Sequence, residues 1–101
     1  MARPTIDELK RRRLAAMSDE ERSEFDETYE ATRLALEVGE RVRDAREAAG
    51  LSQRELAARM GTSQAAVARL EAGGTGATLT TLQKVATALD LQVSVELSAA
   101  P

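Results

Sequence analysis

The chain has 101 residues, with 14 basic and 17 acidic side chains and a formal net charge of −3 at pH 7. It contains neither cysteine nor histidine, which excludes disulfides, thiolate nucleophiles, imidazole bases and Cys/His zinc sites. One phenylalanine and one tyrosine are its only aromatic residues, whereas roomy ligand pockets are usually lined with several. We therefore expect no cofactor, no metal, no small-molecule ligand and no enzymatic activity.

The sequence also lacks the signals of membrane insertion and export. No apolar run approaches the roughly 18 residues that a membrane span needs. The N-terminus has basic residues but no apolar stretch of the kind that a signal peptide carries. We expect a cytoplasmic protein with no membrane partner.

Charge is divided unevenly along the chain. Residues 1–40 hold 7 basic and 11 acidic side chains, for a net charge of −4, whereas residues 41–73 hold 6 and 4, for a net charge of +2. This asymmetry suggests two surfaces for two partners, one partner bearing phosphates and the other basic. A charge of +2 on the middle segment is also ordinary, so the charge alone does not decide the function.

The first expected helix covers residues 5–17. Thr5 is a suitable N-cap, and acidic residues in the first turn favour a helix start. Four consecutive cations at residues 10–13 are open to two interpretations: contact with nucleic acid, or a solvated face, which is the commoner role of such runs.

A second helix is expected from Ser18. Ser18 and Glu21 have the spacing of a capping box, in which each residue's side chain bonds the other's backbone. The only weak point before Ala49 is Gly39, where the apolar stripe also changes. We therefore expect the helix to break or bend near Gly39, and the core domain to begin near Leu34.

The second half of the chain predicts three short helices and one strand. Gly50 ends the preceding helix, and Ser52 with Glu55 forms a second capping box. The expected helices run from this box to Gly61, over residues 64–71, and from Thr78 or Thr80 to about residue 89. Residues 91–97 alternate apolar and polar side chains, which is a strand pattern.

Residues 51–73, LSQRELAARMGTSQAAVARLEAG, carry the most informative motif. Two short helices meet at a turn that holds Gly61, where glycine permits a backbone conformation that a Cβ penalises. Val67 and Leu70 fall on the face of the second helix that is expected to be buried. The residues left outward are short or able to hydrogen-bond, which suits an edge that enters the DNA major groove: Ser63, Gln64, Ala65, Ala68 and Arg69.

This motif resembles the lambda-repressor-like, Xre-type helix-turn-helix family over residues 37–90. The residues that carry the resemblance all fall at the family's spacing: Gly50, Leu51, Ser52, Gln53, Leu56, Ala57, Gly61, Ser63, Gln64, Val67, Leu70, Glu71 and Gly73. The resemblance implies a DNA-binding domain at residues 37–90 that recognises double-stranded operator DNA.

The resemblance also implies roles for single residues. It implies that the bases are read by Gln64, Ala65 and Arg69, with phosphate contact as the alternative role of Arg69. It also implies that the DNA backbone is contacted by Gln53, Thr62 and Ser63. Arg54 and Arg59 are candidates either for phosphate contact or for simple solvation. Arg46 and Glu71 match the positions of a structural ion pair that braces the domain. The glycine-rich loop after Gly73 departs from the family, which usually has proline and a basic residue there.

The predicted strand at residues 91–97 also departs from the family, which usually adds a fifth helix. A lone amphipathic strand is not stable in water, so its apolar residues need a partner: Leu91, Val93, Val95 and Leu97. Pairing with the same strand of a second copy would make a homodimer suited to palindromic DNA. The alternative is that the strand extends the sheet of a partner protein.

The predicted fold is therefore mainly all-α: a lambda-repressor-like helix-turn-helix bundle with a helical extension at residues 1–36 and a short C-terminal β-strand. This architecture resembles HigA-type antitoxins, which neutralise a small basic RelE/ParE-like toxin of the HigB type and repress their own operon. Phe25 and Tyr29 lie one turn apart in an acidic helix, as an interface hot spot requires. We expect a toxin to contact Phe25, Tyr29, Glu21, Glu24 and Asp26.

Two alternatives remain open at this point. In the first, the two aromatic side chains pack on the chain's own core instead of on a partner. In the second, the chain is a stand-alone transcriptional regulator whose N-terminal helices only stabilise the fold.

Overall fold

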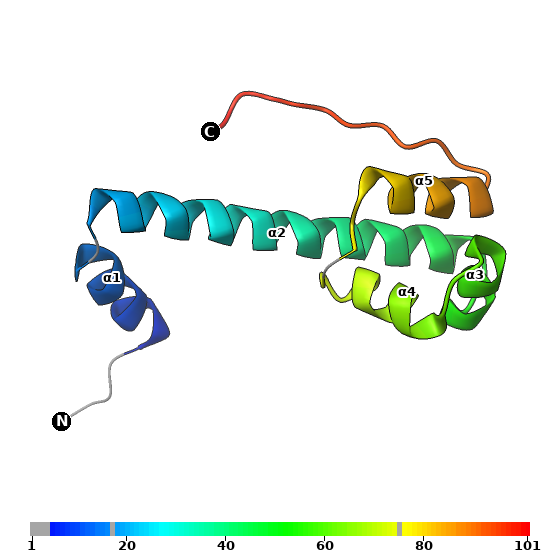
Figure 1. Ribbon diagram of the computed structural model, residues 1–101, viewed down its shortest axis with the longest axis horizontal. Helices are drawn as coiled ribbons and strands as arrows, with labels where there is room; N and C mark the ends of the chain where they lie inside the picture. The colour runs from blue at the N-terminus through cyan, green and yellow to red at the C-terminus, as the bar shows by residue number, and fades with distance from the viewer. Residues whose placement is uncertain (1–4, 17, 75) are drawn as a thin grey trace. The chain divides into compact units, whose positions relative to one another are not determined.

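The computed structural model describes residues 5–16, 18–74 and 76–101. Over these residues the chain forms five helices, α1 (Ile6–Ala16), α2 (Asp19–Ala48), α3 (Gln53–Met60), α4 (Gln64–Glu71) and α5 (Leu79–Ala88), as Figure 1 shows. The chain divides into two compact units, unit 1 at residues 1–32 and unit 2 at residues 33–101. No described helix is both long enough and apolar enough to span a membrane. The first four residues and Met17, which fall within the predicted N-terminal extension, lie outside the described residues.

The predicted helix starts are confirmed in their hydrogen bonds. At the start of α3 the Glu55 N–H donates to Ser52 Oγ over 3.0 Å, and the Ser52 N–H donates to Glu55 Oε1 over 3.1 Å. Ser18 and Glu21 form the same reciprocal pair at 3.2 Å in both directions before α2. Such caps satisfy amide donors that the first turn of a helix otherwise leaves unpaired. They fix where these helices begin.

The predicted helix break at Gly39 is wrong, because α2 continues without interruption from Asp19 to Ala48. Gly39 is buried in this helix against the end of α4. A Cβ at Gly39 would lie 2.5 Å from the carbonyl oxygen of Glu71 and 2.7 Å from that of Leu70. The glycine therefore permits two helices to approach closely. The residues that it contacts lie far along the chain, which is why local helix propensity misassigned it.

Unit 2 holds the hydrophobic core. Figure 1 shows α3, α4 and α5 gathered around the C-terminal part of α2. Leu56 of α3 and Val67 of α4 are completely or almost completely buried, at 0% and 1% exposure. The core cluster consists of Val42, Leu56, Ala57, Val67, Leu70 and Val85. Because the core draws on all four helices, it sets the orientation of each.

The single chain does not form the predicted C-terminal β-strand. Residues 91–101 follow α5 as an extended segment that is neither helix nor strand. The Leu91 N–H still donates to the carbonyl of Ala86 at the end of α5, over 2.7 Å. Beyond that point the segment has no second strand to pair with, and a single strand gains no ladder hydrogen bonds. Val95 and Leu97 are 71% and 95% exposed, so nothing in the single chain buries these two apolar side chains of the alternating pattern.

Candidate functional site

The turn between α3 and α4 is fixed by backbone hydrogen bonds. Gly61 ends α3 with φ of 70°, in the left-handed region that glycine adopts without steric cost. The Thr62 N–H then donates to the carbonyl of Ala57 over 2.9 Å, and the Gly61 N–H to that of Ala58 over 3.3 Å. This pair of bonds is a Schellman motif, a common way for a helix to end. It redirects the chain so that α4 starts three residues later.

Helix α4 presents one face to the core and another to solvent. Ser63 caps it, accepting a hydrogen bond from the Ala66 N–H over 3.1 Å. Val67 and Leu70 are 1% and 3% exposed, so the rotation of the helix about its axis is fixed by packing. The three residues predicted to read DNA bases, Gln64, Ala65 and Arg69, are all exposed. Ser63 is exposed as well, whereas Ala68, which was also expected to face outward, is half-buried.

A buried ion pair joins α2 to α4. Arg46 Nε lies 2.7 Å from Glu71 Oε2, and Arg46 Nη2 lies 3.0 Å from Glu71 Oε1, so the contact is bidentate. Arg46 Nη1 also donates to the carbonyl of Leu51 over 2.7 Å. Only 11% of the arginine side chain and 4% of the glutamate side chain are exposed. Paired geometry of this kind holds planar groups in a defined register, and it fixes the C-terminal end of α4.

The ion pair changes the acidity of both groups. Burial raises the pKa of Glu71, but hydrogen bonds from Arg46 and Gln53 and the arginine's charge outweigh it, so the pKa lies below its ordinary value. The hydrogen bond to Glu71 raises the pKa of Arg46, against the opposing effect of burial. Both groups are therefore charged at neutral pH.

The predicted backbone-contact residues have different surroundings. Thr62, Ser63 and Arg54 are exposed. Gln53 is half-buried, and its side-chain amide donates to Glu71 Oε1 over 3.2 Å, so this residue belongs to the ion-pair cluster. Arg59 donates from Nη1 to the carbonyl of Ala88 over 3.4 Å, at the end of α5. Sequence reasoning missed this last contact, because the partner lies on a helix that is distant in the sequence.

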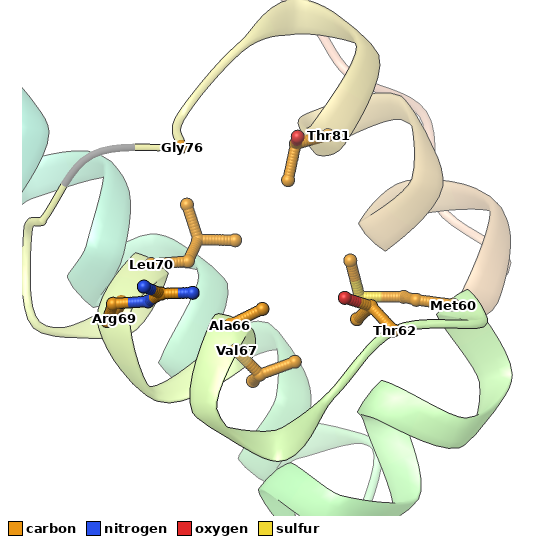
Figure 2. Close-up of a pocket in the computed structure, with 8 residues that line it drawn as sticks. All are labelled: Met60, Thr62, Ala66, Val67, Arg69, Leu70, Gly76 and Thr81. Carbon is orange, nitrogen blue, oxygen red and sulfur yellow. The ribbon is translucent and has the colours of Figure 1, made fainter.

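A small recess lies beside the exposed face of α4. It has a volume of about 160 Å³, and Figure 2 shows the side chains around it. Its lining comes from α3, α4, the loop after α4 and α5: Met60, Thr62, Ala66, Val67, Arg69, Leu70, Gly76 and Thr81. The Arg69 guanidinium and the two threonine hydroxyls are its polar groups, and all three are hydrogen-bond donors. Thr75, within the glycine-rich loop, lies outside the described residues.

The second predicted site lies in unit 1 and is partly covered. Lys10 Nζ of α1 lies 4.1 Å from the centre of the Tyr29 ring, and the Arg13 guanidinium carbon lies 5.6 Å from the centre of the Phe25 ring. Phe25 is half-buried, whereas Tyr29 remains 49% exposed. The carboxylate residues proposed for the same surface, Glu21, Glu24 and Asp26, are exposed. The rings therefore contact the cations of α1.

Comparison with known proteins identifies the family. Residues 42–95 match the helix-turn-helix family, and this match covers more than half of the chain. The chain belongs to the helix-turn-helix family. Within the matched residues, α3 and α4 form the two helices of the motif, and α4 has the position of the second helix. The protein is thus a helix-turn-helix DNA-binding regulator with an all-helical fold over its described residues.

One solved structure gives a close comparison for this helix-turn-helix chain. This chain is similar to the restriction-modification controller protein C.AhdI from Aeromonas hydrophila, at 36% identity and a TM-score of 0.58. The similarity covers 60% of this chain and 88% of that protein. None of the curated proteins matches this chain.

Proposed function

We propose that this helix-turn-helix protein is an antitoxin that represses its own operon by sequence-specific DNA binding. The observation that carries the DNA-binding part is the exposed face of α4, which is opposite the buried Val67 and Leu70. Gln64 pairs with adenine, Ala65 contacts a thymine methyl group, and Arg69 pairs with guanine. Because packing fixes the rotation of α4, these three side chains enter the major groove together.

The contacts to the DNA backbone surround this face. Thr62, Ser63 and Arg54 are exposed and carry hydroxyl or guanidinium donors. Backbone contacts of this type set the register of the protein on the duplex. Gln53 contributes while its amide also supports Glu71. No cofactor or metal takes part, and the protein is not an enzyme.

The protein acts as a homodimer through its C-terminal segment. Leu91, Val93, Val95 and Leu97 alternate with polar residues, and three of the four are exposed. The segment borders a groove of about 660 Å³ that is also lined by apolar residues of α2 and α5. A second copy of the segment supplies the strand partner that the isolated chain lacks. A two-fold dimer then places two recognition helices on a palindromic operator.

The toxin is a small basic protein of the RelE/ParE-like class that binds the N-terminal helices. The first half of α2 carries seven acidic residues between Asp19 and Glu30, with Arg22 as the only basic one. Carboxylates around two aromatic rings form a surface complementary to a cationic partner. The contacts are assigned to Phe25, Tyr29, Glu21, Glu24 and Asp26.

Co-expression tests this proposal. The chain is produced together with the tagged product of the adjacent gene, and both co-purification and growth are measured. The proposal expects a small basic protein to co-purify and its toxicity to be suppressed. A Phe25→Ala/Tyr29→Ala variant should lose the partner but still shift a fragment of its own promoter. Co-purification that is unaffected by this variant would move the toxin site away from unit 1.

The second candidate function is a transcriptional regulator without a toxin partner. The similarity to a restriction-modification controller protein, at 36% identity, favours it. A promoter shift by the protein alone, with no partner recovered and no toxicity suppressed, would select this candidate. Residues 1–36 would then have a structural role only.

A further inference from the structure

The ring-bearing face of α2, formed by Phe25 and Tyr29, is already occupied by cations from the same chain. We propose that this face is a docking surface for a basic helix of a partner protein, and that α1 covers it when no partner is bound. This inference rests on the proposed function for the identity of the partner, but the covering of the face by α1 is testable by itself.

The spacing of the two contacts matches on both helices. Phe25 and Tyr29 are four residues apart, and Lys10 and Arg13 are three residues apart, so each pair spans about one turn of its helix. The two cations reach the two rings at 4.1 Å and 5.6 Å. Both distances lie within the roughly 6 Å range over which a cation is attracted to a ring face. This face therefore selects a helix that carries two cationic side chains about one turn apart.

The hold of α1 on this face is weak. None of the described side chains of unit 1 is buried, and the apolar Ile6 and Leu9 of α1 remain 84% and 50% exposed. These two apolar side chains of α1 therefore bury little surface that would resist displacement. Exposed cation–π contacts are among the weaker stabilising interactions. A partner helix that buries more surface on the same rings would displace α1.

The charges around the rings indicate a protein partner. Glu21, Glu24 and Asp26 lie on the same helix as the two rings, within five residues of one or the other, and are exposed. Carboxylates repel phosphate groups but attract lysine and arginine side chains. The occupant is thus a helix of a basic protein that carries lysine or arginine at positions one turn apart.

A peptide competition experiment tests the covering by α1. The probe is a fluorescein-labelled synthetic peptide with the sequence of residues 6–16, and its anisotropy is measured against the full chain. The variant Lys10→Ala/Arg13→Ala frees the rings, whereas the matched control Arg11→Ala/Arg12→Ala removes the same charge from the same helix. Tyr29 is the only tyrosine and the chain has no tryptophan, so its fluorescence reports the same face directly.

The expected result is peptide binding about tenfold tighter to Lys10→Ala/Arg13→Ala than to the wild type, since two exposed cation–π contacts no longer compete. The control variant should bind like the wild type, and adding Phe25→Ala/Tyr29→Ala should remove the gain. If α1 melts when its cations are removed, the rings are still freed, so the same gain is expected. An equal gain in both cation variants, or no gain in either, would overturn the proposal.

The outcome is separable from that of the proposed function. Tighter peptide binding without any co-purifying toxin would support the proposal that α1 covers the rings and contradict the antitoxin function. Toxin binding without a peptide effect would contradict the covering by α1 and support the antitoxin function.

Discussion

The two units of the chain are stabilised by different means. Unit 2 encloses a core in which Leu56 and Val67 are at most 1% exposed, and a buried ion pair joins α2 to the end of α4. Unit 1 has no buried side chain among its described residues, and its contacts include helix caps and two cation–π contacts. Burial of an apolar side chain stabilises a fold by more than an exposed cation–π contact. Packing therefore stabilises the helix-turn-helix unit more strongly than the described contacts stabilise the N-terminal unit.

The largest expected effect is a difference between the two units in how much a core-type substitution lowers the free energy of unfolding. Leu56→Ala should lower the free energy of unfolding by about 2–5 kcal/mol, because it leaves a cavity in a completely buried site. Phe25→Ala, in unit 1, should leave the main unfolding transition nearly unchanged. Urea denaturation followed by circular dichroism measures both. Equal destabilisation by the two variants would mean that the units share one core.

The next effect tests the close approach of α2 and α4. Gly39→Ala should destabilise unit 2 by about 1–3 kcal/mol, because the new Cβ would lie 2.5 Å from the Glu71 carbonyl oxygen. Helix propensity alone predicts a gain of about 1 kcal/mol for the same change, so the two accounts differ in sign. The neighbouring exposed residue gives a control, Glu40→Ala, with little expected change. A Gly39→Ala protein more stable than wild type would refute the crossing.

A smaller effect depends on pH. The pKa of Glu71 is lowered in the folded state, so its stabilisation is complete above the ordinary glutamate pKa of 4.5 and is lost as the pH falls through the lower folded value. Glu71→Gln should therefore cost about 1–2 kcal/mol at pH 7, and the difference from wild type should shrink in acid. Glu37→Gln, in exposed ion pairs with Arg33 and Arg41, is the control and should have almost no effect. A difference that is constant with pH would contradict the pairing.

Much of unit 2 was predictable because its signals are local. The capping box of Ser52 and Glu55 fixed the start of α3, and Gly61 fixed its end. The burial of Val67 and Leu70 followed from their spacing in a helix of regular period. The exposure of Gln64 and Arg69 followed from the same spacing.

The errors came from interactions that local pattern does not contain. From the sequence alone Gly39 resembles a helix breaker, because its contacts with the end of α4 are not visible there. Arg59 likewise resembles a solvated cation, because its hydrogen bond to the end of α5 joins residues far apart in the sequence. Residues 91–97 have a strand pattern, but a strand needs a second segment that the isolated chain does not provide. The rings of unit 1 were expected to meet either a partner or the chain's core, and they meet the cations of α1.

Recognition of DNA by the exposed face of α4 is the central claim, and operator affinity tests it most directly. The measurement is fluorescence anisotropy of a labelled fragment of the chain's own promoter at one fixed salt concentration. Gln64→Ala and Arg69→Ala should each weaken binding by about 1–3 kcal/mol and relax base preference. Arg41→Ala, an exposed cation on α2, should bind like the wild type. Unchanged affinity in both α4 variants would contradict the assignment of α4 as the helix that reads the operator.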